Sequence, residues 1–150
     1  MKDPNFTVSI ITDKTPEEVF HAVGNIRGWW TENVEGKTLQ EGDIFEVRFG
    51  DVHYSRQQLA EVIPDKKVVW LVTRSRLNFL QDPAEWNGTR ICFDISEQKG
   101  RTELRFTHEG LRPGIECYSA CSNAWADYIS GSLCNLIASG KGNPALKSTG

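Results

Sequence analysis

The chain has 150 residues, enough for one ordinary domain with a real core and too few to suggest two. Hydrophobic residues make up 39% and charged residues 25% of it, a globular composition that argues against disorder. The formal net charge is −3 and the basic residues are scattered, so nucleic acid is not an expected partner. No apolar run approaches the roughly 20 residues of a membrane span, and the first residues lack the apolar core of a signal peptide, which predicts a cytoplasmic protein.

The chain contains four cysteines, which could form two disulfides. A domain of this size without an export signal does not need them, so reduced thiols are expected. Cys117 and Cys121 are spaced to share one face of a helix, as a metal-binding pair would be. Because no further Cys or His lies at a usual zinc spacing, ordinary small buried thiols are the favoured interpretation, and neither a metal nor a cofactor is expected.

The chain opens with a strand followed by a short helix. Apolar and polar side chains alternate from Phe6 to Ile10, the two-residue period of a half-buried strand. Thr15, Pro16 and Glu18 then take the N-cap, N1 and N3 positions of a capping box, whose side chains bond the free amides of a new helix. A Gly-Asn pair ends this helix after a few apolar residues.

The middle of the chain is a series of alternating runs separated by turn residues. Each run predicts a strand, and the connections are too short for the helical crossovers that parallel strands require, so the pairing should be antiparallel. The predicted strands are Leu39 to Phe49, with a break at residues 41–43, Val52 to Ile63, Val68 to Arg74, Thr89 to Ser96, and Arg101 to Glu109.

The last part of the chain is predicted to be one long helix. From about Tyr118 to Ser139 apolar residues, among them Trp125, Ile129 and Leu133, recur at three- and four-residue steps. A helix of roughly six turns is about 30 Å long. Glycines and a proline end it.

These elements predict an α+β fold. A sheet of about six or seven antiparallel strands has one apolar face to cover, and only the terminal helix is long enough to cover it. The sheet should therefore curve around the long C-terminal helix, with short helices after the first strand. Residues 1–144 are expected to form one ligand-binding domain and residues 145–150 a disordered tail.

Several segments, in this order and spacing, resemble the START-like helix-grip superfamily (SRPBCC; polyketide cyclases and pollen allergens). More narrowly they resemble the small bacterial form of the family named after the activator of the heat-shock protein 90 ATPase. The likeness covers roughly residues 6 to 139. The segments that carry it are Phe6 to Thr12 with the following Thr15 to Phe20, Trp29-Trp30, Glu61 to Trp70, Thr102 to Gly110, and Trp125.

The resemblance implies a helix-grip fold with an internal cavity. Its relatives act as polyketide cyclases, as lipid or hormone carriers and as chaperone co-regulators. The family has no invariant catalytic constellation to transfer to this chain, so the resemblance predicts the fold rather than an activity.

Strand parity predicts which side chains line such a cavity. Leu104, Phe106 and His108 share one face of the last strand, while the intervening residues are polar. By the same parity the inward residues of two other strands are Phe45, Val47 and Phe49, and Ile91, Phe93 and Ile95.

His108 is the strongest polar candidate. It is expected either to anchor a ligand or act as a general acid or base in the pocket, or to be a strand-end histidine bonded to a neighbour. Catalysis would require a second positioned group, and the sequence offers only weak candidates. These are Tyr54, Arg56, Arg74 and Tyr128.

The remaining candidates have open alternatives. Trp29 and Trp30 follow the first helix and would either gate the pocket or cap the core. Trp70 and Trp125 would either touch a ligand or belong to the core. One arginine among several near His53 could pair with an acidic head group, although such residues are more often solvated; they are Arg56, Arg74 and Arg76. The apolar segment from Leu77 to Trp86 is interpreted as a lid, a dimer contact or a strand extension.

The sequence thus favours a domain that binds a small hydrophobic molecule in an internal cavity, with no defined activity. The alternatives are a cyclase- or dehydratase-like enzyme that uses His108, and a protein-interaction role related to the chaperone; homodimerisation stays open. The expected ligand-binding residues are Trp29, Trp30, Phe45, Phe49, Tyr54, Trp70, Phe93, Phe106, His108 and Trp125.

Overall fold

The computed structural model describes residues 5–50, 52–78 and 80–145. Most of the tail expected at residues 145–150 lies outside this range. Ala145 itself is held in place, because its N–H donates to the carbonyl of Trp30 at 3.0 Å and its carbonyl accepts from the N–H of Glu32 at 2.8 Å. The last described residue is therefore attached to the segment that follows the short helix ending at Trp29.

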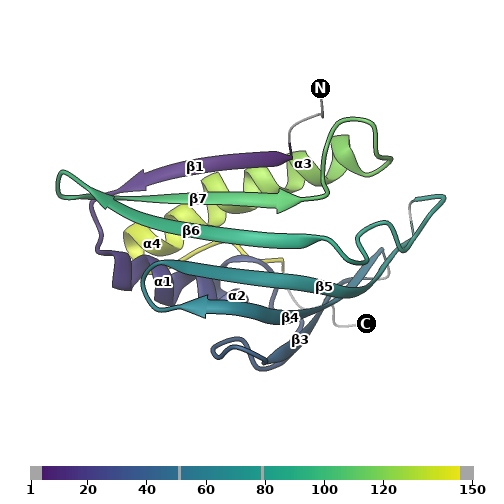
Figure 1. Ribbon diagram of the computed structural model, residues 1–150, viewed down its shortest axis with the longest axis horizontal. Coiled ribbons are helices and arrows are strands. Elements are labelled where there is room, and N and C mark those ends of the chain that lie inside the picture. Colours follow the sequence, from purple (N-terminus) through teal and green to yellow (C-terminus); the bar gives the residue numbers. More distant parts are fainter. Residues whose placement is uncertain (1–4, 51, 79, 146–150) are drawn as a thin grey trace.

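Seven antiparallel strands form one curved sheet, with the helices on its inner side (Figure 1). Their order across the sheet is β1-β7-β6-β5-β4-β3-β2. This confirms the predicted α+β architecture. The strands are β1 (Phe6–Thr12), β2 (Val34–Gly36), β3 (Ile44–Phe49), β4 (His53–Ile63), β5 (Lys67–Leu77), β6 (Arg90–Gln98) and β7 (Arg101–Glu109). The helices are α1 (Pro16–Gly24), α2 (Ile26–Trp29), α3 (Tyr118–Ala126), a π-helical segment (Asp127–Leu133) and α4 (Cys134–Ser139).

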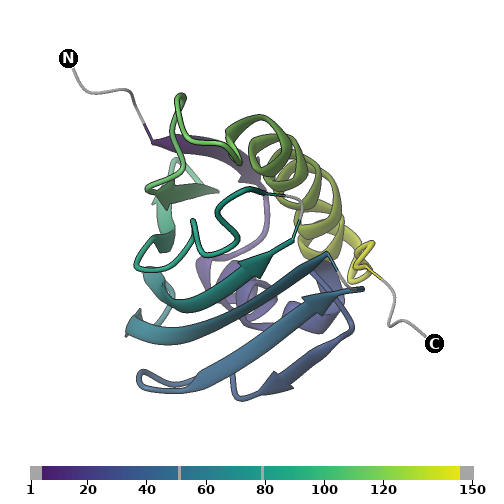
Figure 2. The ribbon, with the colours of Figure 1, turned by 90° about the vertical axis from the view of Figure 1, so that its right-hand side faces the viewer.

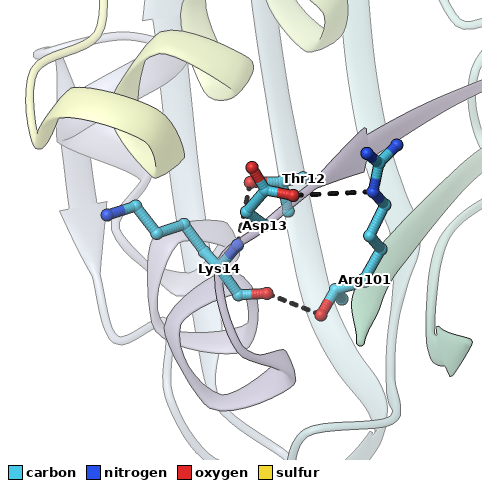
Figure 3. A network of polar contacts seen from close by, with 5 residues as sticks. Thr12, Asp13, Lys14 and Arg101 are labelled. Carbon is cyan, nitrogen blue, oxygen red and sulfur yellow. Dashed lines mark hydrogen bonds and ion pairs between the residues drawn. The ribbon is translucent and has the colours of Figure 1, made fainter. Parts of the chain in front are cut away.

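Helix α1 begins as its sequence predicts. The hydroxyl of Thr15 accepts from the N–H of Glu18 at 3.1 Å, and the Glu18 carboxylate accepts from the N–H of Thr15 at 3.0 Å. The turn before it is fastened to the β6–β7 hairpin, because the Thr102 hydroxyl donates to the Lys14 carbonyl at 2.6 Å. Figure 3 shows this turn, together with the exposed ion pair between Asp13 and the first residue of β7.

Three local features differ from the sequence-based expectations. Strand β2 was not predicted, since three residues are too few to show an alternating pattern. Strand β3 begins at Ile44 rather than at Leu39. The C-terminal helix contains a π-helical segment from Asp127 to Leu133, which widens the turn next to the interior of the protein. Such segments often occur at functional sites.

The inward faces agree with the predicted strand parity. Phe93, Phe106 and His108 are all 0% exposed, and they are in register on adjacent strands, where Phe93 lies opposite Phe106. Figure 2 shows the curled sheet and the C-terminal helix enclosing the interior between them. Among the described residues, no helix has both the length and the apolar character needed to cross a bilayer.

Candidate ligand-binding cavity

A cavity of about 190 Å³ lies between the C-terminal helix and the neighbouring ends of β3 and β4. Its walls are almost entirely aromatic or small. They are formed by Trp30, Phe49, His53, Trp86, Ala120, Cys121, Ala124, Trp125 and Tyr128. Because Ala120 and Ala124 are exposed to solvent while Trp125 is buried, the cavity opens along the alanine face of α3.

The wall is assembled from segments that are distant in sequence. Trp30 follows α2, Phe49 ends β3, and His53 begins β4 immediately after the connecting turn. Trp86 comes from the loop between β5 and β6. This loop is bound to the start of α3, where the Glu85 carboxylate accepts from two backbone N–H groups at 2.8 and 3.0 Å. Trp86 is thereby held against the helix that forms the opposite wall.

All five tryptophans form one stacked series that runs from the core into this wall. Trp29 stacks on Trp70 with ring centroids 6.3 Å apart, and Trp70 stacks on Trp30 at 5.5 Å. Trp30 then stacks on Trp125 at 5.0 Å, and Trp125 on Trp86 at 5.9 Å with an interplanar angle of 13°. Because Trp29 and Trp70 are buried behind the last three indoles, they support the wall rather than form it.

His53 is a half-buried polar side chain in the wall. Its ring is enclosed edge-on by Phe49 and Trp86, each with its centroid 4.9 Å away, and this burial lowers its pKa to about 3. The imidazole is therefore neutral at physiological pH. Its Nε2 lies 2.9 Å from the Ser55 hydroxyl, while Nδ1 has no partner among the described residues. A neutral imidazole of this kind can bond a polar group of a bound molecule.

His108 lies behind the wall and both of its ring nitrogens are occupied. Its Nδ1 accepts from the indole N–H of Trp125 at 3.1 Å, so the proton is on Nε2, which donates to the Thr89 hydroxyl at 2.9 Å. Thr89 in turn donates to the carbonyl of Trp86 at 2.6 Å. Burial, together with the charge His53 would carry, lowers the pKa of His108 to about 3. His108 therefore orients Trp125 and the Trp86 loop, and it is not among the residues that touch the cavity.

The structure places the ten expected ligand-binding residues in three environments. Trp30, Phe49 and Trp125 are in the cavity wall. Tyr54 points to the opposite, outer side of the sheet, where it adjoins arginines. The other expected residues are packed in the core outside the wall: Trp29, Phe45, Trp70, Phe93, Phe106 and His108. That any of these ten residues binds a ligand stays a prediction.

Sequence reasoning did not assign several wall residues to the site. Ala120 and Ala124 carry no chemical signal, because small residues on an exposed helix face are common. Trp86 lies in the segment interpreted as a lid or dimer contact, and the structure places this indole over the cavity. His53 could have been found from parity, since it precedes the buried Ser55 by two residues on the same strand.

The helical spacing brings the sulfurs of Cys117 and Cys121 to one face of the helix, with Cα atoms 5.5 Å apart. The expectation of reduced thiols stays a prediction for this pair. Cys92 and Cys134 are free. Within the described residues, no three His, Cys, Asp or Glu side chains gather as metal ligands would.

A helix-grip domain with an aromatic internal cavity is the class of protein that this fold and cavity define. The model of the family described as "Activator of Hsp90 ATPase homolog 1-like protein" matches residues 13–138, so the chain belongs to this family. A search among curated proteins gave no significant match.

Solved structures with the same fold cover nearly the whole chain. The Aha1 dimer from Colwellia psychrerythraea is 25% identical with a TM-score of 0.73, over 93% of this chain and 99% of that one. SSP2350 from Staphylococcus saprophyticus is 14% identical with a TM-score of 0.70, over 95% and 98% of the two chains. CalU16 from Micromonospora echinospora is 15% identical with a TM-score of 0.63, over 89% and 74%. The last two show similarity of fold alone.

Proposed function

We propose that the protein binds a small, neutral, aromatic molecule in this cavity. The observation that carries the proposal is a hollow of about 190 Å³ whose large lining side chains are all aromatic rings. A dry cavity of about 150 Å³ is known to take up benzene, and pockets for drug-sized ligands measure about 300–1,000 Å³. A molecule of one or two rings matches this volume, whereas a long acyl chain or an extended polyketide exceeds it.

Neutral polar groups support a ligand that carries a hydroxyl or a carbonyl. Nδ1 of His53 has no hydrogen-bond partner among the described residues. Burial, with a smaller contribution from Asp127, raises the pKa of the Tyr128 hydroxyl, which keeps it protonated. Two buried atoms lack a hydrogen-bond partner among the described residues. They are Nε1 of Trp86, a wall residue, and Oε1 of Gln57, whose Nε2 donates to the Ser55 hydroxyl that also contacts His53. Unsatisfied buried polar atoms are rare, and a ligand or ordered water would satisfy them.

The expected affinity is modest. Burial of about 150–250 Å² of aromatic surface at about 25 cal/mol per Å² contributes about 4–6 kcal/mol. This corresponds to a dissociation constant between about 1 mM and several tens of micromolar. Ligand-observed NMR with 2-naphthol, with naphthalene lacking the hydroxyl, and with dodecanoate as a long-chain comparison should detect binding of the two aromatic compounds, with 2-naphthol favoured.

A cavity-filling variant tests the site. Ala124→Phe adds a ring at the mouth without disturbing the buried core, and it should abolish 2-naphthol binding. Asn123→Phe places the same ring on the neighbouring exposed position outside the wall and should leave the dissociation constant within about twofold. If the wild type binds neither aromatic compound, or if Ala124→Phe binds 2-naphthol as the wild type does, the proposal fails.

Homodimerisation is a second proposal, supported by the Aha1 dimer from Colwellia psychrerythraea, which this chain matches over 93% of its length. Strand β1 lies at an edge of the sheet and carries Ile11, which is 64% exposed. An edge strand with free backbone groups and an apolar side chain is suited to pairing with a second copy. Light scattering at two protein concentrations should find a dimer; a monomer at both concentrations would contradict it.

A further inference from the structure

The outer face of the sheet carries an ordered group of arginines that the cavity does not use. Strand register places Tyr54 between Arg48 on β3 and Arg76 on β5. The next outward row places Arg56 between Glu46 and Arg74 in the same way. Arg56 and Arg74 are directly opposed, and like charges at the distance of about 5 Å between opposed Cβ atoms destabilise a pair. Four guanidinium groups and one carboxylate thus share a small area of a chain whose overall charge is −3.

The single carboxylate of this group makes no close ion pair with the arginines. The Tyr54 hydroxyl donates to the Glu46 carboxylate, and no ion pair within 4 Å joins Glu46 to any of the four arginines. The guanidinium of Arg48 lies over the Tyr54 ring, 4.7 Å from its centroid. Burial and the bond to Glu46 raise the pKa of Tyr54, which keeps its hydroxyl protonated as a donor. In these two rows four guanidinium groups thus face one carboxylate, which leaves an excess of three positive charges.

Three of the arginines line one groove of about 470 Å³. Arg48, Arg74 and Arg76 form its sheet side with Tyr54 and Ser75, while Pro83 and Ala84 form its other side. The two acidic residues of that loop are bonded to backbone N–H groups, Asp82 to that of Ala84 and Glu85 to those at the start of α3. Neither is among the residues that line the groove.

We propose that this groove is a second binding site, for a multivalent oxyanion that carries two linked phosphate groups. Guanidinium groups donate paired N–H bonds that match the oxygens of a phosphate group, and three of them from two strands can surround more than one such oxygen pair. Two linked phosphate groups would offset the repulsion among Arg48, Arg74 and Arg76, whereas a monovalent anion offsets less of it. The site lies on the outer face of the sheet and does not depend on the proposed function of the cavity.

Inorganic pyrophosphate is the probe for this site. In calorimetry at about 20 mM salt the wild type should bind it, and the affinity should fall steeply as salt is raised, because the interaction is between exposed charges. A triple variant, Arg48→Gln, Arg74→Gln and Arg76→Gln, should weaken binding at least tenfold. The matched control removes three charges from exposed positions outside the groove, with Arg90→Gln, Arg105→Gln and Arg112→Gln, and should change the affinity less than threefold.

NMR of the arginine Nε–Hε groups identifies the bound face. Pyrophosphate should shift the signals of Arg48, Arg74 and Arg76 and leave that of Arg105 unchanged. The cavity variant Ala124→Phe should bind pyrophosphate as the wild type does, so a failure of the cavity proposal is distinguishable from a failure of this one. Absence of binding to the wild type, equal losses in the two triple variants, or shifts confined to other arginines would each overturn the proposal.

Discussion

Mild acid should destabilise this protein because it folds around a neutral buried imidazole. His108 is 0% exposed, and burial lowers its pKa from 6.5 to about 3. Below about pH 6.5 the unfolded chain takes up a proton on this ring, while the folded chain does not until about pH 3. The stability that comes from keeping His108 neutral is therefore fully present above about pH 6.5. It is lost progressively as the pH falls from about 6.5 to about 3.

The magnitude follows from about 1.4 kcal/mol per unit of pKa difference. Between pH 7.5 and pH 5, His108 alone should lower the free energy of unfolding by about 2 kcal/mol. His53 has a similarly lowered pKa and adds a smaller loss, because its ring keeps accessible surface toward the cavity. The total is a large part of the about 5–15 kcal/mol that stabilises an ordinary domain. Carboxylates titrate mainly below pH 5, so the change in unfolding free energy between pH 7.5 and pH 5 comes mainly from the histidines.

Urea unfolding at the two pH values measures this loss. The wild type should lose about 2–4 kcal/mol between pH 7.5 and pH 5. His108→Gln will be less stable at both pH values, but its loss between them should be smaller by about 2 kcal/mol. His21→Gln, at an exposed position on α1, should lose as much as the wild type. A wild-type loss below about 1 kcal/mol would refute the reasoning that the imidazole of His108 is buried and neutral.

Three further outcomes are expected. Trp125→Phe removes the donor to Nδ1 of His108 and should cost about 1–3 kcal/mol in urea unfolding, because a buried acceptor is left unpaired; an unchanged midpoint would contradict this bond. Thr15→Ala removes the helix cap of α1 and should cost about 1 kcal/mol, seen as a lower melting temperature, whereas Thr15→Ser should retain most of it. Alkylation of denatured protein without reductant, followed by mass spectrometry, should modify both Cys117 and Cys121, because a domain of this size does not need a disulfide; protection of both that a reductant removes would contradict this expectation.

Much of the fold could be predicted because its signals are local. Alternation over a few residues sets which side chains of a strand are buried, and Phe93, Phe106 and His108 are buried as the alternation predicts. The capping box at Thr15 begins α1 for an equally local reason, since the bonded groups are only three residues apart. The π-helical segment was not predictable, because apolar spacing alone does not distinguish it from an α-helix.

The candidate site depended on packing between distant segments. Trp30, His53, Trp86 and Ala124 become neighbours only when the sheet curves and the β5–β6 loop is bound to α3. Tyr54, adjacent to His53, faces the outer groove rather than the cavity, because neighbouring side chains on a strand point to opposite faces.

By itself, then, the sequence determined the order of the elements, the antiparallel pairing and the inward side of most strands, since these depend on residues a few positions apart. Only the tertiary structure decided that both ring nitrogens of His108 are hydrogen-bonded, to Trp125 and Thr89. It also decided that Trp30 and His53 lie in the cavity wall. Hydrogen-bond partners and cavity volume depend on how side chains of different elements fill the space between them. Short-range periodicity in the sequence does not predict this packing.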